Sequence, residues 1–405
     1  MAVGKKVSRL TKLTVRDVEV GAKRVLVRVD FNVPLDADGA IMDDSRLRAA
    51  LPTIEYLIEH GAKVILCSHL GRPKGRVVEG LRMAVVARRL SQLLGRPVGT
   101  TLDCIGPEVE LAVAGLKEGD VLLLENVRFH PEEENNDATF TQALAKLADI
   151  YVNDAFGTAH RAHASVVGIA RYLPAVSGLL LEQEMVNLGR IMEDPPRPVA
   201  ALLGGAKVSD KVSMIENIMD KIDYILIGGG MAATFLKANS YRIGKSLIEA
   251  DRVATAAELI ASALRNGVTL LLPVDVVVAG ELTTRAEGRV VSIDNILEDD
   301  RIVDIGPATI KSFQGSLRKC KAIFWNGPMG IYELPQFAEG TKALALFLAN
   351  LEATTVIGGG STADAVAELG LTDRMTFVST GGGASLDFLS GKALPGIEAL
   401  PDKEA

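Results

Sequence analysis

The chain has 405 residues, more than one hydrophobic core usually serves, so two domains are expected. Its composition, 48% hydrophobic and 23% charged, is that of an ordinary globular protein, and no stretch approaches the roughly 20 apolar residues of a membrane span. The net charge of −7 argues against a broad nucleic-acid footprint, and three cysteines without CxxC spacing predict neither a disulfide framework nor a zinc site.

Short apolar runs alternate with helical patterns along the first half, which is the signature of βαβ units and a parallel sheet. The expected strands are VLVRV, KVILCS, VLLLEN and DIYVNDA. Helical patterns lie over SRLRAALPTIEYLIEHGA and LRMAVVARRLSQLLG, and Gly61 after His60 closes the first.

The segment LLLEQEMVNLGRIMEDPPRP, residues 179–198, begins as a helical pattern and ends in prolines that forbid a helix from continuing. It is therefore expected to be a hinge helix and linker between two α/β lobes, 1–178 and 199–392. In the second lobe the expected strands are VAALLGG, YILIGGG, TLLLPVD, AIFWNGP, TTVIGGG and MTFVSTGGG.

Ligands of open parallel sheets bind beyond the carboxyl ends of the strands. In the first half those ends carry polar and basic side chains, namely Asp30, Asn32, His69, Arg72, Arg128, His160 and Arg161. Arginine matches the geometry of phosphate and carboxylate. We therefore expect a small anionic ligand whose hydroxyls meet Asp30 and Asn32.

The strand ends of the second half carry glycine instead, in LLGGAK, LIGGGMAATF, VIGGGSTADAV and STGGGASL. Such turns let backbone approach a ligand closely and aim helix N–H groups at anions. Four of them in one lobe predict a polyanionic ligand such as a nucleotide.

Two nucleotide chemistries can be weighed against this pattern. No GxxxxGK[ST] occurs, so the lobe is not a P-loop domain. The Gly228 and Gly358 turns satisfy the looser dinucleotide pattern, which keeps an NAD-dependent dehydrogenase as the alternative. That fingerprint needs an acidic residue about 20 positions on to hold the ribose, and Asp275 is much too distant, so the dinucleotide interpretation is disfavoured.

Taken in order, VRVDFNVP, SHLGRP, LENVRFHPEEE, VNDAFGTAHRAHAS, LGGAKVSDK, IGGGMAATFLK, FWNGPMGIYE, GGGSTADAV and STGGGASLDFL resemble the phosphoglycerate kinase family from end to end. The resemblance implies two Rossmann-like three-layer α/β/α lobes with parallel sheets, joined by the hinge helix. It also implies that the tail, residues 393–405, joins the first lobe. The implied activity is reversible phosphoryl transfer between 1,3-bisphosphoglycerate and ADP, giving 3-phosphoglycerate and ATP, by in-line transfer with hinge closure.

The resemblance also implies site residues, matched motif by motif. The expected phosphoglycerate contacts are Asp30, Phe31, Asn32, Arg46, His69, Leu70, Gly71, Arg72, Arg128 and Arg161. The expected nucleotide contacts are Gly205, Lys207, Lys211, Gly228, Gly229, Asn326, Pro328, Glu333, Gly359, Gly360, Ser361 and Thr362. Arg46, Lys207, Gly382 and Gly383 are expected to act on the transferring group.

Two positions depart from the family: a mild change at Asp387, where glutamate is frequent, and a more consequential one at Ser361. An acid usually follows the GGG of VIGGG and is understood to contact the nucleotide's magnesium, whereas this chain has Ser361. A hydroxyl is a poorer ligand for a hard cation than a carboxylate. We expect altered handling of Mg²⁺ with activity retained, and no metal ligands can be named from the sequence.

The resemblance further implies a cytoplasmic monomer with small-molecule partners, Mg²⁺ as cofactor, and no nucleic-acid or membrane partner. The opening MAVGKKVSRLTKL has positive charges without the apolar run of a secretion signal. A third possibility is a two-lobed solute-binding protein. Such a protein is expected to carry a secretion signal, and this interpretation does not explain why nucleotide-type turns occur in one lobe only.

Overall fold

The computed structural model describes residues 11–193 and 195–403. Its internal contacts divide the chain into two compact units, Met1–Val186 with Ala393–Ala405, and Asn187–Lys392. The division falls inside helix α6 (Leu179–Glu193), the segment that the sequence predicts as a hinge. Residues 1–10, the greater part of the segment read for a targeting signal, lie outside the described residues.

Unit 1 is built on a six-stranded sheet whose strands are all parallel, in the order β3-β4-β2-β1-β5-β6. The strands are β1 (Arg24–Arg28), β2 (Lys63–Cys67), β3 (Val98–Thr100), β4 (Val121–Leu123), β5 (Ile150–Asn153) and β6 (Ala175–Ser177). The four predicted strands are confirmed as β1, β2, β4 and β5. The two edge strands, β3 and β6, were not predicted, because VGT and AVS lack the run of large apolar residues that marks β4.

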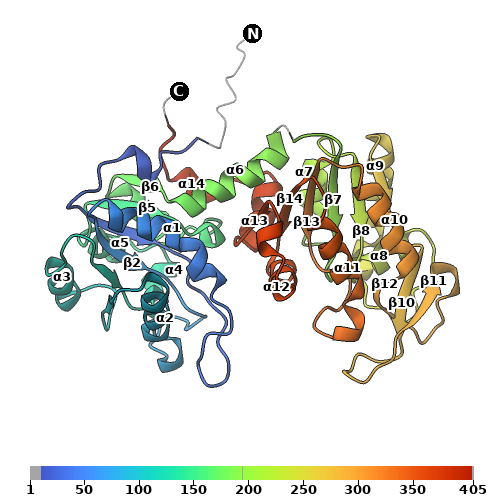
Figure 1. Cartoon of the computed structure of the whole chain (residues 1–405), viewed down its shortest axis with the longest axis horizontal. Helices are drawn as coiled ribbons and strands as arrows, with labels where there is room; N and C mark the ends of the chain where they lie inside the picture. Colours follow the sequence, from blue (N-terminus) through green and yellow to red (C-terminus); the bar gives the residue numbers. More distant parts are fainter. Residues whose placement is uncertain (1–10, 194, 404–405) are drawn as a thin grey trace, which may run out of the picture. The chain divides into compact units, whose positions relative to one another are not determined.

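Helices flank this sheet and connect its strands (Figure 1). They are α1 (Ser45–Glu59), α2 (Ala84–Leu94), α3 (Pro107–Ala114), α4 (Pro131–Glu134), α5 (Ala138–Ala145) and α14 (Pro395–Glu398), with 3-10 turns η1 (Val15–Asp17), η2 (Glu79–Leu81), η3 (Val127–Phe129), η4 (Phe156–Thr158) and η5 (Gly168–Arg171). The two predicted helices are confirmed as α1 and α2. His60 caps α1, and Gly61 follows with a φ of +71°.

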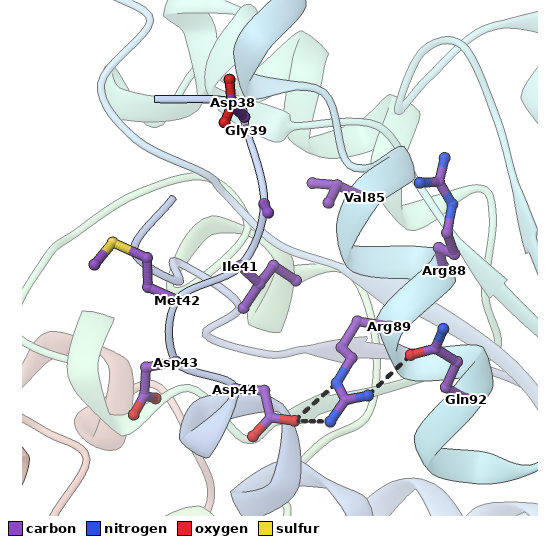
Figure 2. A pocket seen from close by; sticks show the side chains of 11 residues that line it. Asp38, Gly39, Ile41, Met42, Asp43, Asp44, Val85, Arg88, Arg89 and Gln92 are labelled. Atoms are coloured by element: carbon purple, nitrogen blue, oxygen red, sulfur yellow. Dashed lines mark hydrogen bonds and ion pairs between the residues drawn. The ribbon is translucent and has the colours of Figure 1, made fainter. Parts of the chain in front are cut away.

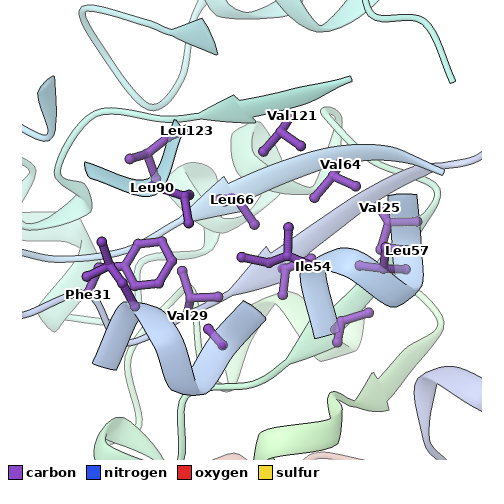
Figure 3. Close-up of a cluster of buried hydrophobic side chains, with 14 of the residues drawn as sticks. Val25, Val29, Phe31, Ile54, Leu57, Val64, Leu66, Leu90, Val121 and Leu123 are labelled. Atoms are coloured by element: carbon purple, nitrogen blue, oxygen red, sulfur yellow. The ribbon is translucent and has the colours of Figure 1, made fainter. Parts of the chain in front are cut away.

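The core of unit 1 lies between its sheet and helices α1 and α2 (Figure 3). Val25, Val27 and Val29 point to this face and meet Ile54 and Leu57 of α1, all fully buried. Each such side chain contributes about 1.5–3 kcal/mol of burial free energy. The alternate residues of β1 are buried on the opposite face, as expected for a parallel sheet covered on both sides.

The C-terminal tail packs onto unit 1. The backbone N–H of Gly396 donates to the Ala159 carbonyl (2.8 Å), and the side-chain amide of Asn153 donates to the Gly396 carbonyl (3.1 Å). Further along the tail, Lys403 forms an ion pair with Asp17, in which Nζ lies 2.5 Å from Oδ1. These contacts place the last described residues beside the first.

Unit 2 has its own six-stranded parallel sheet, in the order β15-β14-β13-β7-β8-β9. The strands are β7 (Val199–Leu203), β8 (Tyr224–Ile227), β9 (Thr269–Leu271), β13 (Ala322–Asn326), β14 (Thr354–Gly358) and β15 (Phe377–Val378). Its helices are α7 (Val212–Ile218), α8 (Met231–Ala238), α9 (Val253–Arg265), α10 (Pro307–Leu317), α11 (Glu339–Leu348), α12 (Gly360–Glu368) and α13 (Gly383–Leu389), with η6 (Ala250–Arg252), η7 (Ile293–Asn295), η8 (Pro335–Phe337) and η9 (Thr372–Arg374).

A second, antiparallel sheet of unit 2 was not predicted. Its strands are β10 (Asp275–Ala279), β11 (Arg289–Ser292) and β12 (Arg301–Ile305), in the order β11-β10-β12. The run TLLLPVD, expected to be one strand, ends as β9 at Leu271, and β10 starts at Asp275. Asp275 is buried and accepts hydrogen bonds from Ala308 N and Thr309 N, so it caps α10.

The cysteines match their expectation as unpaired thiols. Cys67, Cys104 and Cys320 are free and buried. Within the described ranges, none of the helices is both long and apolar enough to cross a bilayer.

Candidate active site

Four strands of unit 1 end at one edge of its sheet, since β1, β2, β4 and β5 run parallel. The residues that follow them include the predicted anion-binding side chains. Hydrogen bonds through Asn32, Gly71 and Arg128 join the turns after β1, β2 and β4, so these strand ends form one connected site.

The end of β1 makes the first part of this site. Arg46, in the first turn of α1, donates from Nη1 to Asp30 Oδ2 at 2.7 Å. Asn32 accepts from Gly71 N at 2.8 Å, which ties the turn after β1 to the turn after β2. Phe31 is buried, and its backbone N–H donates to Ser68 Oγ (2.9 Å).

His69 lies buried at the centre of the site, 3% exposed. Its Nδ1 is 3.2 Å from Arg28 Nη2. A guanidinium can only donate, so Nδ1 accepts and the ring proton stays on Nε2. Burial lowers the pKa of His69 well below its ordinary value, and nearby arginines, Arg28 first, add to the shift. His69 is thus a neutral donor within a positive surrounding.

Arg128 is the other buried cation of the site, 4% exposed. Its Nη1 donates to the Gly71 carbonyl at 3.1 Å. Its Nε lies 3.3 Å from Glu134 Oε1 but makes no hydrogen bond within the described residues. Burial, Arg28 and Arg161 lower the pKa of Arg128 to about 10, so the group stays charged at neutral pH. A buried guanidinium with unused donor capacity is suited to bind an anion.

The two remaining predicted arginines differ in their surroundings. Arg161 is half-buried, and its charge acts on His69, Arg128 and His163. Arg72 is exposed. Arg161 therefore acts on the cluster through its charge, and neither its guanidinium nor that of Arg72 makes a hydrogen bond within the described residues.

The buried carboxylate of Glu133 supports the cluster through Ser165 and Arg28. Glu133 is fully buried and accepts from Ser165 N (2.9 Å) and Ser165 Oγ (2.6 Å), and Ser165 Oγ in turn accepts from Arg28 Nε at 2.8 Å. His163 Nδ1 lies 3.8 Å from Glu133 Oε1. Burial lowers the pKa of His163 to about 4, with Arg128 and Arg28 adding to the shift.

A separate cavity of about 630 Å³ lies on unit 1 between the loop 38–44 and α2 (Figure 2). Asp44, at its edge, accepts from Arg89 Nη2 at 2.6 Å and from Arg48 Nε at 2.8 Å. The lining contains none of the predicted site residues. Since Asp44 immediately precedes α1, these ion pairs fix the start of the helix that carries Arg46.

In unit 2 the turns after β7, β8 and β13 pack backbone against backbone. Gly205 N donates to the Pro328 carbonyl (2.8 Å) and Gly229 N to the Met329 carbonyl (2.9 Å). Gly229 has a φ of +61°, and a Cβ there would lie 2.5 Å from Gly205 N. A Cβ at Gly228 would lie 2.5 Å from Met329 Sδ. Only glycine permits this approach.

A cavity of about 760 Å³ opens beside these turns. Among its lining residues are four of the predicted nucleotide contacts, Gly205, Pro328, Glu333 and Ser361. The rest of the lining includes peptide from Gly230 and Gly330 and apolar side chains of Leu247, Ile248, Leu282, Ile302, Val303 and Ile331. Apolar walls beside exposed peptide suit a ligand with a flat base and an anionic tail.

Three predicted residues beside this cavity have different roles. Asn326 is buried, and its Nδ2 makes no hydrogen bond within the described residues. Thr362 is buried and accepts from Gly327 N at 2.7 Å, so it holds the turn after β13. Burial lowers the pKa of Lys211, whose Nζ would lie 3.5 Å from a Cβ on Gly205.

Other predicted residues do not line the cavity. Lys207 is exposed, Gly359 and Gly360 form the start of α12, and Gly382 and Gly383 lie at the start of α13. Gly359 and Gly382 have φ values of +87° and +54°.

Residues missed by the sequence analysis fall into two groups. Arg28, the last residue of β1, contacts His69, and Ser165 and Glu133 hold Arg28 in place. A lone charge inside an apolar run was the available signal for Arg28. The cavity segments Lys245–Ile248 and Arg301–Val303 gave no such signal, because they belong to or flank the unpredicted sheet.

Comparison with known proteins gives a consistent result. The family model described as phosphoglycerate kinase matches residues 15–392. Curated phosphoglycerate kinases from Moorella thermoacetica and Dictyoglomus turgidum are 56% and 55% identical, over 97% and 98% of this chain and 100% of each relative. Solved phosphoglycerate kinase structures from Coxiella burnetii and Pyrococcus horikoshii align with TM-scores of 0.84 and 0.86 at 41% and 35% identity, each covering 96% of this chain and 98% of the other. The chain belongs to the phosphoglycerate kinase family.

Proposed function

We propose that unit 1 binds the phosphoglycerate substrate at the arginine cluster and that unit 2 binds ADP or ATP in the glycine-walled cavity. The reaction is that of the family, the reversible transfer of a phosphoryl group between 1,3-bisphosphoglycerate and ADP. One contrast supports this assignment. Unit 1 has buried cationic side chains, whereas the cavity of unit 2 is lined by apolar side chains and glycine backbone.

The roles in unit 1 follow from charge and position. Arg128, Arg161 and the Nε2–H of His69 bind the phosphate that does not react, and Arg72 reaches it from the exposed rim. Asp30 and Asn32 bind the glycerate hydroxyl and carboxylate region, with Phe31, Leu70 and Gly71 shaping the turn. Arg46, held by Asp30, faces the transferring group.

In unit 2 the nucleotide packs against the backbone of Gly205, Gly228 and Gly229, whose N–H groups already donate within the protein. It also contacts Pro328, Glu333 and the side-chain amide of Asn326. Lys207, Lys211 and the turn Gly359–Thr362 bind its phosphates. Gly382 and Gly383 offer peptide N–H groups to the transferring group. Backbone donors are fixed in place before the ligand arrives, so little reorganisation is needed.

The chemistry requires no general base. A carboxylate or phosphate oxygen is ionised at neutral pH, so the nucleophile needs no activation. The protein has to align donor and acceptor and to compensate charge on the moving group, for which Arg46 and Lys207 are suited.

Magnesium is proposed as the cofactor. Ser361 lines the cavity, and the Asp364 carboxylate lies one helical turn further along α12, so oxygen ligands are present. When bound to the nucleotide phosphates, Mg²⁺ neutralises their charge. Ser361, Asp364 or water between them would hold it.

A coupled assay tests the function. The purified protein is given ADP and 1,3-bisphosphoglycerate, and ATP is measured. Formation of ATP that depends on both substrates is expected. Reduction of NAD in place of ATP formation would revive the dehydrogenase alternative, and tight closure on one ligand without turnover would favour a binding protein.

In-line transfer requires the two bound substrates to meet, so we also propose hinge bending at residues 179–198. Small-angle scattering should show compaction only when both substrates are present. An unchanged radius of gyration in the ternary complex would contradict it. We further propose that the protein is a monomer and that it works in the cytoplasm. The three free thiols suit that reducing compartment.

A further inference from the structure

A cluster of three different metal-ligand types lies in unit 1, apart from the residues assigned to substrate. Asp103 and Cys104 belong to the loop between β3 and α3, and His130 caps α4. One ligand atom from each of the three lies within 4.8 Å of the other two. We propose that Asp103, Cys104 and His130 form a binding site for a divalent cation of the zinc class.

The cluster is ordered by contacts of its own. Asp103 Oδ1 lies 2.6 Å from His130 Nε2 and accepts from Cys104 N at 2.6 Å. Thr101 Oγ1 donates to the Asp103 carbonyl at 2.6 Å, and the His130 ring packs on Phe140 with centroids 5.2 Å apart. The three groups are thus held together before any ion arrives, which lowers the entropy cost of binding.

Burial gives the cluster an inner and an outer side. Cys104 is 1% exposed, and its Sγ makes no hydrogen bond within the described residues. Asp103 is exposed and His130 partly so. An ion can therefore enter past the carboxylate and imidazole and meet the thiol at the base, with water completing its coordination.

The distances suit a small tetrahedral ion. Zn–S bonds of about 2.3 Å and Zn–N or Zn–O bonds of about 2.0–2.1 Å place neighbouring ligand atoms roughly 3.3–3.6 Å apart. The His130–Asp103 contact must open by less than about 1 Å, or the second carboxylate oxygen can serve. On binding, the Cys104 thiol gives its proton to solvent, and His130 moves its ring proton from Nε2 to Nδ1.

The ligand set also decides which ions bind. One thiolate, one imidazole and one carboxylate favour zinc, cobalt or copper, whereas magnesium prefers oxygen ligands alone. The site is thus independent of the nucleotide's magnesium and of the proposed function. Because His130 directly follows η3, which carries Arg128, a bound ion would join the β3–α3 loop to the segment that holds a substrate arginine.

Cobalt titration of the reduced full-length protein tests the site. Co²⁺ added alone should produce a thiolate-to-cobalt charge-transfer band that saturates at one equivalent and disappears when Zn²⁺ is added. Zn²⁺ should also raise the melting temperature. His130→Gln and Asp103→Asn should each weaken Co²⁺ binding at least tenfold. Addition of Mg²⁺ should leave the Co²⁺ band of the unaltered protein unchanged.

Matched variants keep the test decisive. Cys104→Ser should abolish the band, and Cys67→Ser and Cys320→Ser should retain it, because their thiols lie outside the cluster. If Cys104→Ser fails to fold, the His130 and Asp103 variants still decide the question. A band that survives both of those variants, or no band in the unaltered protein, would overturn the proposal.

Discussion

The two proposed binding sites, one in each unit, are built by different physical means. Unit 1 uses charged side chains whose positions depend on buried partners, as Arg28 does through Ser165 and Glu133. Unit 2 uses peptide groups whose positions depend on glycine. The first kind of site is sensitive to loss of charge, whereas the second is sensitive to the addition of a single carbon.

The largest expected effect comes from removing a side-chain charge in unit 1. Arg46→Met should lower kcat about 10²–10³-fold, the usual cost of losing one donor to a developing charge. The control is Arg48→Met, two residues along α1, whose exposed guanidinium pairs with Asp44. Steady-state kinetics measures both. Equal losses in the two variants would show that the helix, rather than the charge at position 46, was damaged.

The matching change in unit 2 adds one methyl group. Gly229→Ala combines a left-handed φ with a Cβ 2.6 Å from the Pro328 carbonyl, so it should cost about 2–5 kcal/mol of unfolding free energy and weaken ADP binding. Gly370 has a similar φ of +66° with nothing near its Cβ. Gly370→Ala should therefore cost only about 1–2 kcal/mol. Urea unfolding and ADP titration compare them, and identical behaviour would refute the role of close packing.

Two buried groups, one in each unit, should respond oppositely to acid. His163 has its pKa lowered to about 4, so the unfolded state binds more protons below pH 6.5 and stability falls as pH decreases. Asp304, in unit 2, has its pKa raised to about 7, mainly by burial, so its contribution to stability is lost as pH rises toward 7.

Variants separate these two contributions. When the pH falls from 7 to 5, protonation linked to His163 should lower the free energy of unfolding by about 2 kcal/mol, and His163→Gln should abolish this decrease. Over the same range Asp304 should raise the free energy of unfolding by a similar amount, and Asp304→Asn should abolish this increase. Chemical unfolding at both pH values measures each difference against the unaltered protein. Shifts of the same sign in both variants would contradict the assignment.

The smallest effect is expected at the departure from the family pattern. Ser361→Asp should lower the Mg²⁺ concentration for half-maximal activity several-fold, because a carboxylate binds a hard cation better than a hydroxyl does. Ser361→Asn supplies a control of the same size without charge. If the Mg²⁺ curves of all three proteins coincide, the departure has no significance for metal binding.

The sequence determined the features that depend on local pattern. Alternating apolar runs predicted four strands of unit 1 and the strands of the parallel sheet of unit 2, and Gly61 predicted the end of α1, because periodicity and φ preferences act over a few residues. Family motifs located Asp30, Arg46 and Arg128, which the structure gathers at one sheet edge.

The tertiary structure decided what depends on distant contacts. The edge strands β3 and β6 lack an apolar run of their own, and the β10–β12 sheet was not predicted, so the partners of these strands define them. Arg28 counts as a site residue because His69 meets it 41 positions later. Cysteine spacing likewise predicted no zinc site, yet folding brings His130 to Asp103 and Cys104, since a ligand set is defined by distances in space and not along the chain.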